Sequence, residues 1–431
     1  MPRDSVAFDE PPLSTRVETD PTRLDGDLPA SAVGTRHFLL IFGPFGPFAG
    51  TLAKSLRAAG ARCSRVILNG GDLFDWGAGH ARAYHGPLSG FGGWLTRIVH
   101  RDQVTDIIVY GDAHPYCAEA LRVAGLAGLD AHVLEQGYFR PFWITLERWG
   151  VNGNSSLPRD AAAYRQSAFC LPAPADEWLP PLTPPSVRNL ALYHLALWLA
   201  TPAFPLFRLP YRYTLPRQAF SHTRRYLDQR LRRPHHRRRL AAALEAPGPR
   251  FIGILQRPGD SQLNEHSPFA TTAEFIDRVV TSFARHAPPS ATLLFKSHPL
   301  DHGIEPHART VAAAGAAHGV AGRVFFTDIG DLHAMLPKTA GAITVNSTGG
   351  LSAMGLGRPT QVLGKAIYDM QGLTHQGGLD TFWTAPQAPD PALYDAFRRL
   401  VIHRTQISGA YAIRQGIDRA VPEVTRRLLS P

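Results

Sequence analysis

The 431-residue sequence has few of the residues that build covalent or metal-held scaffolds. Cys63, Cys117 and Cys170 are its three cysteines, far apart and odd in number, which excludes a disulfide framework and a zinc site. A reducing cytosol is the simplest compartment for such a chain. No run of eighteen apolar residues occurs, so a clear transmembrane helix is excluded, and residues 1–32 lack the apolar core of a secretory signal.

Lysine is also scarce, and the positive charge is almost all arginine. Lys and Arg together number 45 against 35 acids, which gives a formal net charge of +10. This excess predicts a polyanionic partner: nucleic acid, an anionic membrane, or a phosphorylated and acidic substrate. A hydrophobic fraction of 44% and a charged fraction of 19% are typical of a globular protein. The length predicts two or three domains.

Two series of short apolar strands alternate with helical patterns, which predicts two parallel sheets. The first series is 37–42, 65–69, 106–110 and 131–134; the second is 251–255, 292–295, 324–326, 342–345 and 360–363. We therefore expect an α/β fold of the GT-B type, with two Rossmann-like domains facing a cleft. The expected parts are a disordered tail (1–34), an N-terminal Rossmann-like domain (35–185), a basic helical connecting segment (186–248), a C-terminal Rossmann-like domain (249–400) and a C-terminal helical segment (401–431); the family resemblance described below implies that the first domain binds the acceptor and the second a CMP-sugar.

Two motifs at strand ends in the second series predict a nucleotide site. Asn346-Ser347-Thr348-Gly349-Gly350 precedes a helix, where small hydroxyls, amides and the positive helix end favour an anion. The alternative is an ordinary Ser/Thr cap with a tight turn. Lys296-Ser297-His298-Pro299 carries a histidine that could bind phosphate or protonate a leaving group, or simply be a satisfied loop residue.

Carboxylates follow one strand in each series. Gln256 to Asp260 ends a strand of the second series, and Glu135 with Arg140 ends the fourth strand of the first. Two facing carboxylates suit acid/base and nucleophilic chemistry at a sugar carbon. The alternatives are a turn cap for Asp260 and a structural ion pair for Glu135.

The connecting segment combines an apolar helix candidate, Leu190 to Ala200, with a basic aromatic stretch and a run of arginines. His235 and His236 lie in that run and are expected at the surface rather than at a metal. The alternative to a membrane-binding role is a solvated face beside a core helix. The arginines that would contact a membrane, a role favoured by the family resemblance described next, are Arg232, Arg233, Arg237, Arg238 and Arg239.

The chain resembles the KpsS/KpsC family of bacterial capsular polysaccharide proteins, and most resembles KpsS because it has a single catalytic unit. The resemblance runs in order from about His37 to Trp383. It is carried by Glu135 to Glu147 with Gly150-Val-Asn152, Gln256 to Phe269, Lys296 to Pro299, and Val345 to Leu351 followed by Gly364, Tyr368, Gly372-Leu-Thr374 and Phe382-Trp383.

The resemblance implies a retaining β-Kdo transferase that uses CMP-Kdo and adds Kdo to phosphatidylglycerol or its lyso form. Implied roles are nucleophile for Asp260 and acid/base for Glu135, with Glu147 as a rival. The expected donor-binding residues are Lys296, His298, Pro299, Asn346, Ser347, Thr348, Gly349, Arg140 and Gln256. No metal or other cofactor is expected, because no Asp-X-Asp-like motif stands out.

The implied location is cytoplasmic, peripheral on the anionic inner face of the cytoplasmic membrane, with other capsule assembly proteins as partners. Three alternatives stay open: a Kdo-linker-extending transferase, another nucleotide-sugar transferase such as a UDP-dependent one, and a non-catalytic capsule assembly or export subunit. Nucleic acid is not expected as a partner, because no RNA- or DNA-binding motif accompanies the charge.

Overall fold

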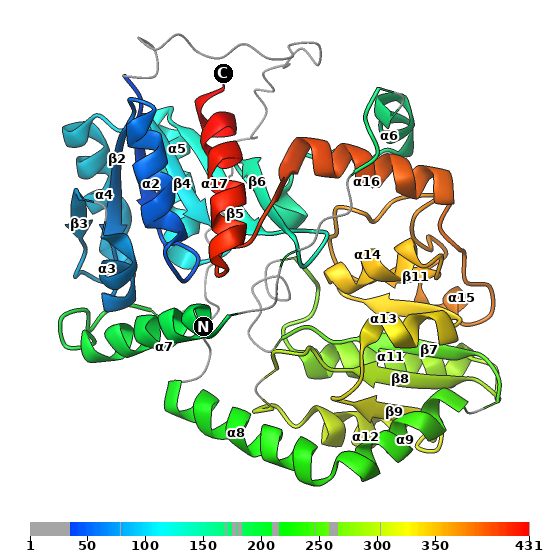
Figure 1. Ribbon diagram of the computed structural model, residues 1–431. Helices are drawn as coiled ribbons and strands as arrows, with labels where there is room; N and C mark the ends of the chain where they lie inside the picture. Colours follow the sequence, from blue (N-terminus) through cyan, green and yellow to red (C-terminus); the bar gives the residue numbers. More distant parts are fainter. Residues whose placement is uncertain are drawn as a thin grey trace, which may run out of the picture.

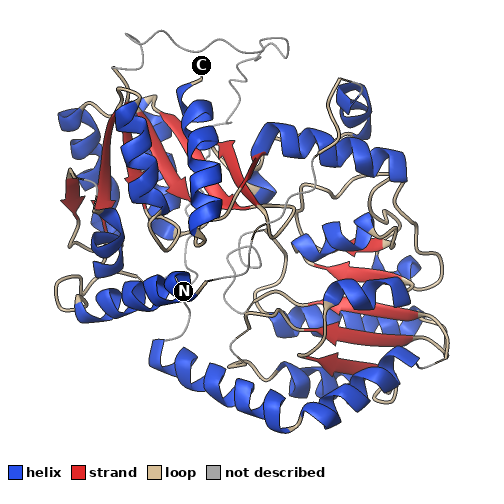
Figure 2. Cartoon of the chain, viewed as in Figure 1, coloured by secondary structure: helices blue, strands red, loops and turns tan. Residues whose placement is uncertain are grey.

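In the computed structural model, the chain folds into two α/β lobes, each a sheet with helices on its faces (Figures 1 and 2). The structure describes residues 35–77, 79–168, 170–174, 179, 183–208, 215–245, 247–257, 266–301 and 303–430. These two lobes confirm the predicted architecture.

The first sheet has the strand order β12-β6-β5-β4-β1-β2-β3. Strands β1 to β5 pair in parallel as predicted and β1 is buried along its whole length, whereas β6 and β12 pair antiparallel, so this sheet is mixed rather than parallel throughout. The strands are β1 (His37–Ile41), β2 (Arg62–Ile67), β3 (Ala81–Ala83), β4 (Asp106–Tyr110), β5 (Asp130–Gln136), β6 (Trp143–Arg148) and β12 (Gln406–Ser408). The helices of this lobe are α2 (Phe48–Ala58), α3 (Gly70–Trp76), α4 (Leu88–Asp102) and α5 (Pro115–Ala127).

The second sheet is parallel throughout, in the order β11-β10-β7-β8-β9. Aromatic rings fill one side of it: Trp383 contacts Phe251 and Phe283 at ring-centroid distances of 5.0 and 5.2 Å. The strands are β7 (Arg250–Ile254), β8 (Thr292–Lys296), β9 (Val324–Thr327), β10 (Gly341–Thr344) and β11 (Thr360–Val362). The helices are α11 (Thr272–His286), α12 (His307–Ala317), α13 (Leu332–Met335), α14 (Thr348–Gly355) and α15 (Leu379–Phe382).

The connecting segment is helical and attaches to both lobes. Its helices are α7 (Pro184–Leu199), α8 (Leu215–Leu231) and α9 (Arg233–Glu245), and α6 (Ala161–Ala168) precedes it in the chain. Helix α7 packs on α3, where Gly70 and Gly71 have no room for a Cβ against Ala196 and Tyr193. Helix α9 covers the second sheet, with Ala243 in the core beside Ile252 and Ile254.

The end of the chain returns to the first lobe. Helix α16 (Pro391–Thr405) crosses from the second lobe, and β12 then pairs antiparallel with β6. Helix α17 (Arg414–Leu429) packs on α2, where the Thr425 hydroxyl donates to Ser55 Oγ at 2.9 Å. The segment 401–431 was expected to be helical, and it also supplies the edge strand β12. This strand has three residues, too few to be recognised in the sequence.

Candidate functional site

The loop after β10 holds the first predicted donor motif at the start of α14. Ser347 is the N-cap of that helix, and its Oγ accepts a hydrogen bond from Gly349 N at 3.1 Å. The Tyr368 hydroxyl donates to Ser347 O at 2.5 Å and leaves no room for a Cβ at Gly350. The Ser347 hydroxyl oxygen therefore acts as a helix cap, which was the alternative to an anion site. The N-terminus of α14 still favours an anion nearby.

Gln256 and Asn346 connect this motif to the end of β7. The Gln256 side-chain amide donates to Asn346 Oδ1 across the two loops. Gln256 is buried, and within the described part of the chain its Oε1 has no hydrogen-bond partner. A buried carbonyl oxygen without a partner costs free energy, so this side chain is suited to accept a hydrogen bond from a ligand.

The second motif follows β8, where His298 has a defined tautomer. Leu300 N donates to His298 Nδ1 at 3.0 Å, so the neutral ring carries its proton on Nε2. Burial, followed by the charges of Arg140 and Arg257, lowers the pKa of His298 to about 4. His298 is therefore a neutral donor at pH 7, and it takes up a proton more easily once an anion binds beside it.

Cations from both lobes surround His298. Arg140 belongs to the loop after β5 in the first lobe, and Arg257 follows β7 in the second. Lys296 is buried, its Nζ donates to Ser297 O at 2.8 Å, and burial lowers its pKa to about 8. Pro299 is exposed. The structure thus brings predicted Arg140, Lys296 and His298, together with the carboxylate of Asp301, into one mainly positive region that suits a phosphate or carboxylate.

Glu135 lies at the carboxyl end of β5 and is half-buried. Its Oε1 accepts from Gln136 N at 2.8 Å, and the Tyr411 hydroxyl donates to the Glu135 carbonyl oxygen at 2.9 Å. Gly111, with φ of 70°, lies beside the carboxylate: a Cβ there would be 3.1 Å from Glu135 Oε2. The returning C-terminal segment and the loop after β4 therefore fix the place of this carboxylate.

Glu147, the rival of Glu135, is buried inside the first lobe. The Tyr138 hydroxyl donates to its Oε1 at 2.6 Å, and the Ser155 hydroxyl donates to its Oε2. Burial raises the pKa of Glu147 to about 7. Because both oxygens accept internal hydrogen bonds, this carboxylate is committed to the interior of the first lobe.

Several predicted residues stay untested by the structure or lie apart from this region. Asp260 lies outside the described residues. Arg232, Arg233, Arg237 and Arg238 are exposed at the end of α8 and on α9, and the side chain of Arg239 is not described. Asp72, another carboxylate near a strand end, forms a buried ion pair with Arg65 at 2.8 Å, so it is committed to the interior.

Arg225 is a residue that sequence reasoning missed. From α8, its guanidinium donates to Ser297 Oγ at 3.1 Å and to Asp301 O, and it lies 3.6 Å from Asp328 Oδ2. It therefore holds the loop that carries His298. In the sequence it is one arginine in a basic stretch, and no pattern there distinguishes it from its exposed neighbour Arg224.

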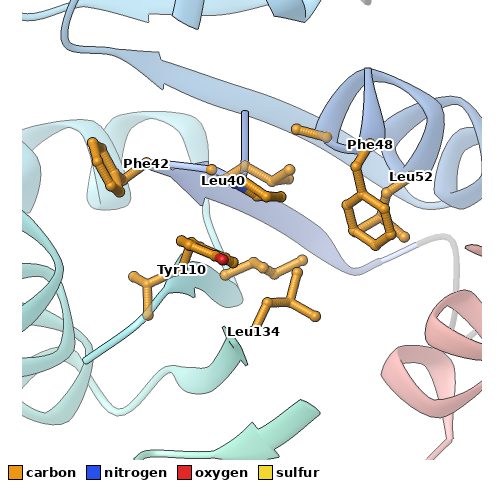
Figure 3. Close-up of a pocket in the computed structure, with 11 residues that line it drawn as sticks. Leu40, Phe42, Phe48, Leu52, Tyr110 and Leu134 are labelled. Carbon is orange, nitrogen blue, oxygen red and sulfur yellow. The ribbon is translucent and has the colours of Figure 1, made fainter. Parts of the chain in front are cut away.

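The hollows inside the first lobe do not form the site. One cavity has a volume of about 10 Å³, room for about one water molecule, and its apolar lining includes Leu40, Phe42, Phe48, Leu52, Tyr110 and Leu134 (Figure 3). A hollow of about 500 Å³ lies at the amino ends of β1 and β2, beside His37 and Arg62. Ligands of parallel sheets bind at the opposite, carboxyl edge.

The described residues include neither a membrane-crossing helix nor a cluster of metal ligands. None of the helices there combines the length and the apolar character that crossing a bilayer requires. Within the same residues, no three His, Cys, Asp or Glu side chains are grouped so that they could hold a metal ion.

Two α/β lobes, each built on a sheet with a parallel core, define the class of GT-B-like proteins. Within that class, a sequence model described as "Capsule polysaccharide biosynthesis protein" matches residues 105–411. The chain belongs to this capsule polysaccharide biosynthesis family, as the resemblance predicted.

Two relatives cover nearly the whole chain. The "Capsule polysaccharide export protein KpsS" of Escherichia coli is 33% identical over 378 residues, which are 87% of this chain and 97% of the relative. The "Capsule polysaccharide modification protein LipB" of Neisseria meningitidis serogroup A is 30% identical over 405 residues, covering 90% and 95%. Among solved structures, the β-Kdo 2,7 transferase KpsC of Thermosulfurimonas dismutans is 11% identical, covers 91% of this chain and 99% of its own, and has a TM-score of 0.45.

Proposed function

We propose that the protein is a glycosyltransferase that transfers β-Kdo from CMP-Kdo to phosphatidylglycerol or lysophosphatidylglycerol and so starts the lipid-linked poly-Kdo terminus of a capsule. The observation that carries this proposal is the positive region around His298, to which both lobes contribute cations. CMP-Kdo has a phosphate and a sugar carboxylate, and such a pair of anions is suited to this region. The proposal is also supported by membership of the capsule family.

The donor phosphate is assigned to His298 and the N-terminus of α14. Nε2–H of His298 donates to a phosphate oxygen, and Arg140 and Arg257 balance the charge. Gln256, Asn346, Ser347, Thr348 and Gly349 line the same loops and position the nucleotide. Lys296 adds positive charge from beneath the loop.

Sugar transfer is assigned to two carboxylates in a double displacement. Asp260 attacks the anomeric carbon of Kdo, the bond to the CMP phosphate oxygen breaks, and CMP leaves with the electron pair. Glu135 then takes the proton of the acceptor hydroxyl, whose oxygen attacks the same carbon and releases Asp260. Two inversions retain the configuration, and no metal takes part in this scheme.

The acceptor places the protein at the inner face of the cytoplasmic membrane. Arg232, Arg233, Arg237, Arg238 and Arg239 would attract anionic headgroups at about 1 kcal/mol each near the surface. Other capsule assembly proteins are expected partners, and nucleic acid is not.

Calorimetry with CMP and UDP tests the donor assignment. We expect CMP to bind and UDP to bind at least tenfold more weakly. Tighter binding of UDP would favour another nucleotide-sugar transferase of the same architecture, and binding of neither would favour a non-catalytic assembly or export subunit.

A further inference from the structure

Exposed hydrophobic side chains are concentrated in one part of the molecule. Of seventeen large hydrophobic side chains that the structure describes as exposed, eleven lie between Val187 and Leu231. They are Val187, Leu190, Leu192, Leu195, Trp198, Leu199, Leu206, Phe220, Tyr226, Leu227 and Leu231. Single exposed hydrophobics are ordinary on a protein surface, whereas a concentration of this kind marks an interaction site.

Helix α7 supplies the first half of this surface. Arg188 is the one charged residue in its sixteen, and Trp198 and Leu199 are 60% and 62% exposed. Its inner side is fixed to the first lobe, where the Tyr193 hydroxyl donates to Asn69 Oδ1 at 3.4 Å. The helix is thus held by the protein on one side and presents hydrocarbon on the other.

Helix α8 supplies the second half of this surface. Its apolar side faces outward and its polar side faces the second lobe, which is the reverse of the usual arrangement in a soluble protein. Phe220, Leu227 and Leu231 share one face, because they are seven and eleven residues apart, and they are 73%, 48% and 78% exposed. Arg225 and Gln229 on the other side bind the second lobe, and Gln229 Nε2 donates to Asp328 Oδ2 at 2.9 Å. A helix that buries its polar side and exposes its apolar side needs an apolar partner outside the chain.

The charge around this surface selects the kind of partner. Residues 184–245 contain twelve arginines against two acids, Asp228 and Glu245. Arg217, Arg224 and Arg230 are exposed on α8 itself, and Asp228 lies 3.2 Å from Arg232 Nε. An apolar face with arginines beside it matches a bilayer surface with anionic headgroups, and it would repel a second copy of the same positive surface.

We propose that the outer faces of α7 and α8, here called the α7–α8 face, dock on an anionic lipid bilayer. Trp198, Phe220, Leu227 and Leu231 enter the headgroup boundary, and the arginines contact the phosphates. Helix α7 is attached to the first lobe and α8 to the second, and the two follow one another along the lower edge of the molecule in Figure 1, so docking holds both lobes at the membrane. This docking adds a membrane-contact surface to the proposed function. It rests on the proposed function only for the identity of the lipid acceptor.

Vesicle sedimentation of the full chain tests the proposal. The variant Phe220→Ser/Leu227→Ser/Leu231→Ser changes exposed positions, and Leu126→Ser/Leu356→Ser is its matched control on α5 and after α14. On vesicles of phosphatidylglycerol and phosphatidylethanolamine, we expect the triple variant to partition at least tenfold less than the wild type and the control to be unchanged. Phosphatidylcholine vesicles should bind the wild type weakly, and Gln at Arg232, Arg233, Arg237, Arg238 and Arg239 should flatten the salt dependence.

Two results overturn the proposal. One is equal vesicle binding by the wild type and the triple variant. The other is absence of wild-type vesicle binding together with a dimer that the triple variant abolishes, which would assign the face to a second copy. CMP binding, measured on each variant, is expected to be unchanged; its absence from the wild type would contradict the proposed function and leave this docking proposal standing.

Discussion

At the scale of single residues, the surroundings of the two side chains distinguish Glu135 from Glu147. The sequence alone gave no basis for this distinction. Both are glutamates near the ends of one short segment, and the spacing gives no preference. In the structure, Glu147 is enclosed between Tyr138 and Ser155, whereas Glu135 lies at the carboxyl end of β5. Burial and hydrogen bonding depend on β6 pairing with β5, which no local pattern revealed.

The pH dependence of stability tests the role of Glu147. Its pKa is raised from 4.5 to about 7, so its contribution to stability is fully present below pH 4.5 and is lost as the pH rises through 7. The shift corresponds to roughly 3 kcal/mol. We expect urea unfolding between pH 5 and 8 to show this loss in the wild type and in Glu135→Gln, and a flatter profile in Glu147→Gln. A profile unchanged by Glu147→Gln would contradict the structural role.

His298 is predicted to bind the donor phosphate through one N–H. A hydrogen bond to a charged group contributes about 1.5–3 kcal/mol, so His298→Ala should weaken CMP binding by roughly ten- to a hundredfold. His298→Gln, which keeps a donor, should recover part of the affinity, and Ser347→Ala should weaken binding less. Calorimetry measures all three. Unchanged affinity in both His298→Ala and Ser347→Ala would remove the proposed nucleotide site.

At the scale of elements, the sequence predicted the buried parallel strands well and the irregular ones poorly. Continuous apolar runs such as Phe251 to Leu255 identify a strand covered on both faces, and Phe275, Val279 and Phe283 identify the inner side of α11. Strands β3, β6 and β12 were missed, because two are three residues long and β6 alternates with polar side chains. The contacts of α8 were missed for a different reason: they join residues about 70 to 100 positions apart.

Arg225 makes α8 a support for the His298 loop, and Arg230 on the same helix provides a matched control. Arg225→Ala removes the bonds to Ser297 and Asp301, and we expect CMP affinity to fall about tenfold with a loss of about 1–3 kcal/mol in unfolding free energy. Arg230→Ala, at an exposed position whose guanidinium donates to the Tyr226 hydroxyl of the same helix, should change stability by less than about 0.5 kcal/mol. Calorimetry and urea unfolding measure the two effects. Equal behaviour of the two variants would show that α8 does not support the donor loop.

At the scale of the whole molecule, two lobes each contribute one proposed catalytic carboxylate. Glu135 belongs to the first sheet, and Asp260 follows β7 of the second in the sequence. The sequence supplied both candidates through strand ends and family resemblance, and Asp260 lies outside the described residues. The proposed role of Asp260 is therefore argued from the chemistry of sugar transfer and from the family resemblance.

Trapping a covalent intermediate tests that role. In Glu135→Gln supplied with CMP-Kdo, proton transfer is impaired while the nucleophile remains, so a Kdo adduct should accumulate on Asp260. Intact-protein mass spectrometry with peptide mapping locates it. Asp260→Asn should abolish both adduct and transfer. An adduct on Glu147, or full activity of Asp260→Asn, would contradict the assignment.

The most direct test of the central claim is the mass of the product formed by purified protein from CMP-Kdo and phosphatidylglycerol. We expect a lipid heavier by one Kdo residue and release of one CMP for each product, with neither formed by Asp260→Asn. It would be contradicted by a protein that binds CMP-Kdo and the lipid but leaves both unchanged, or by one that transfers a sugar from a UDP donor instead.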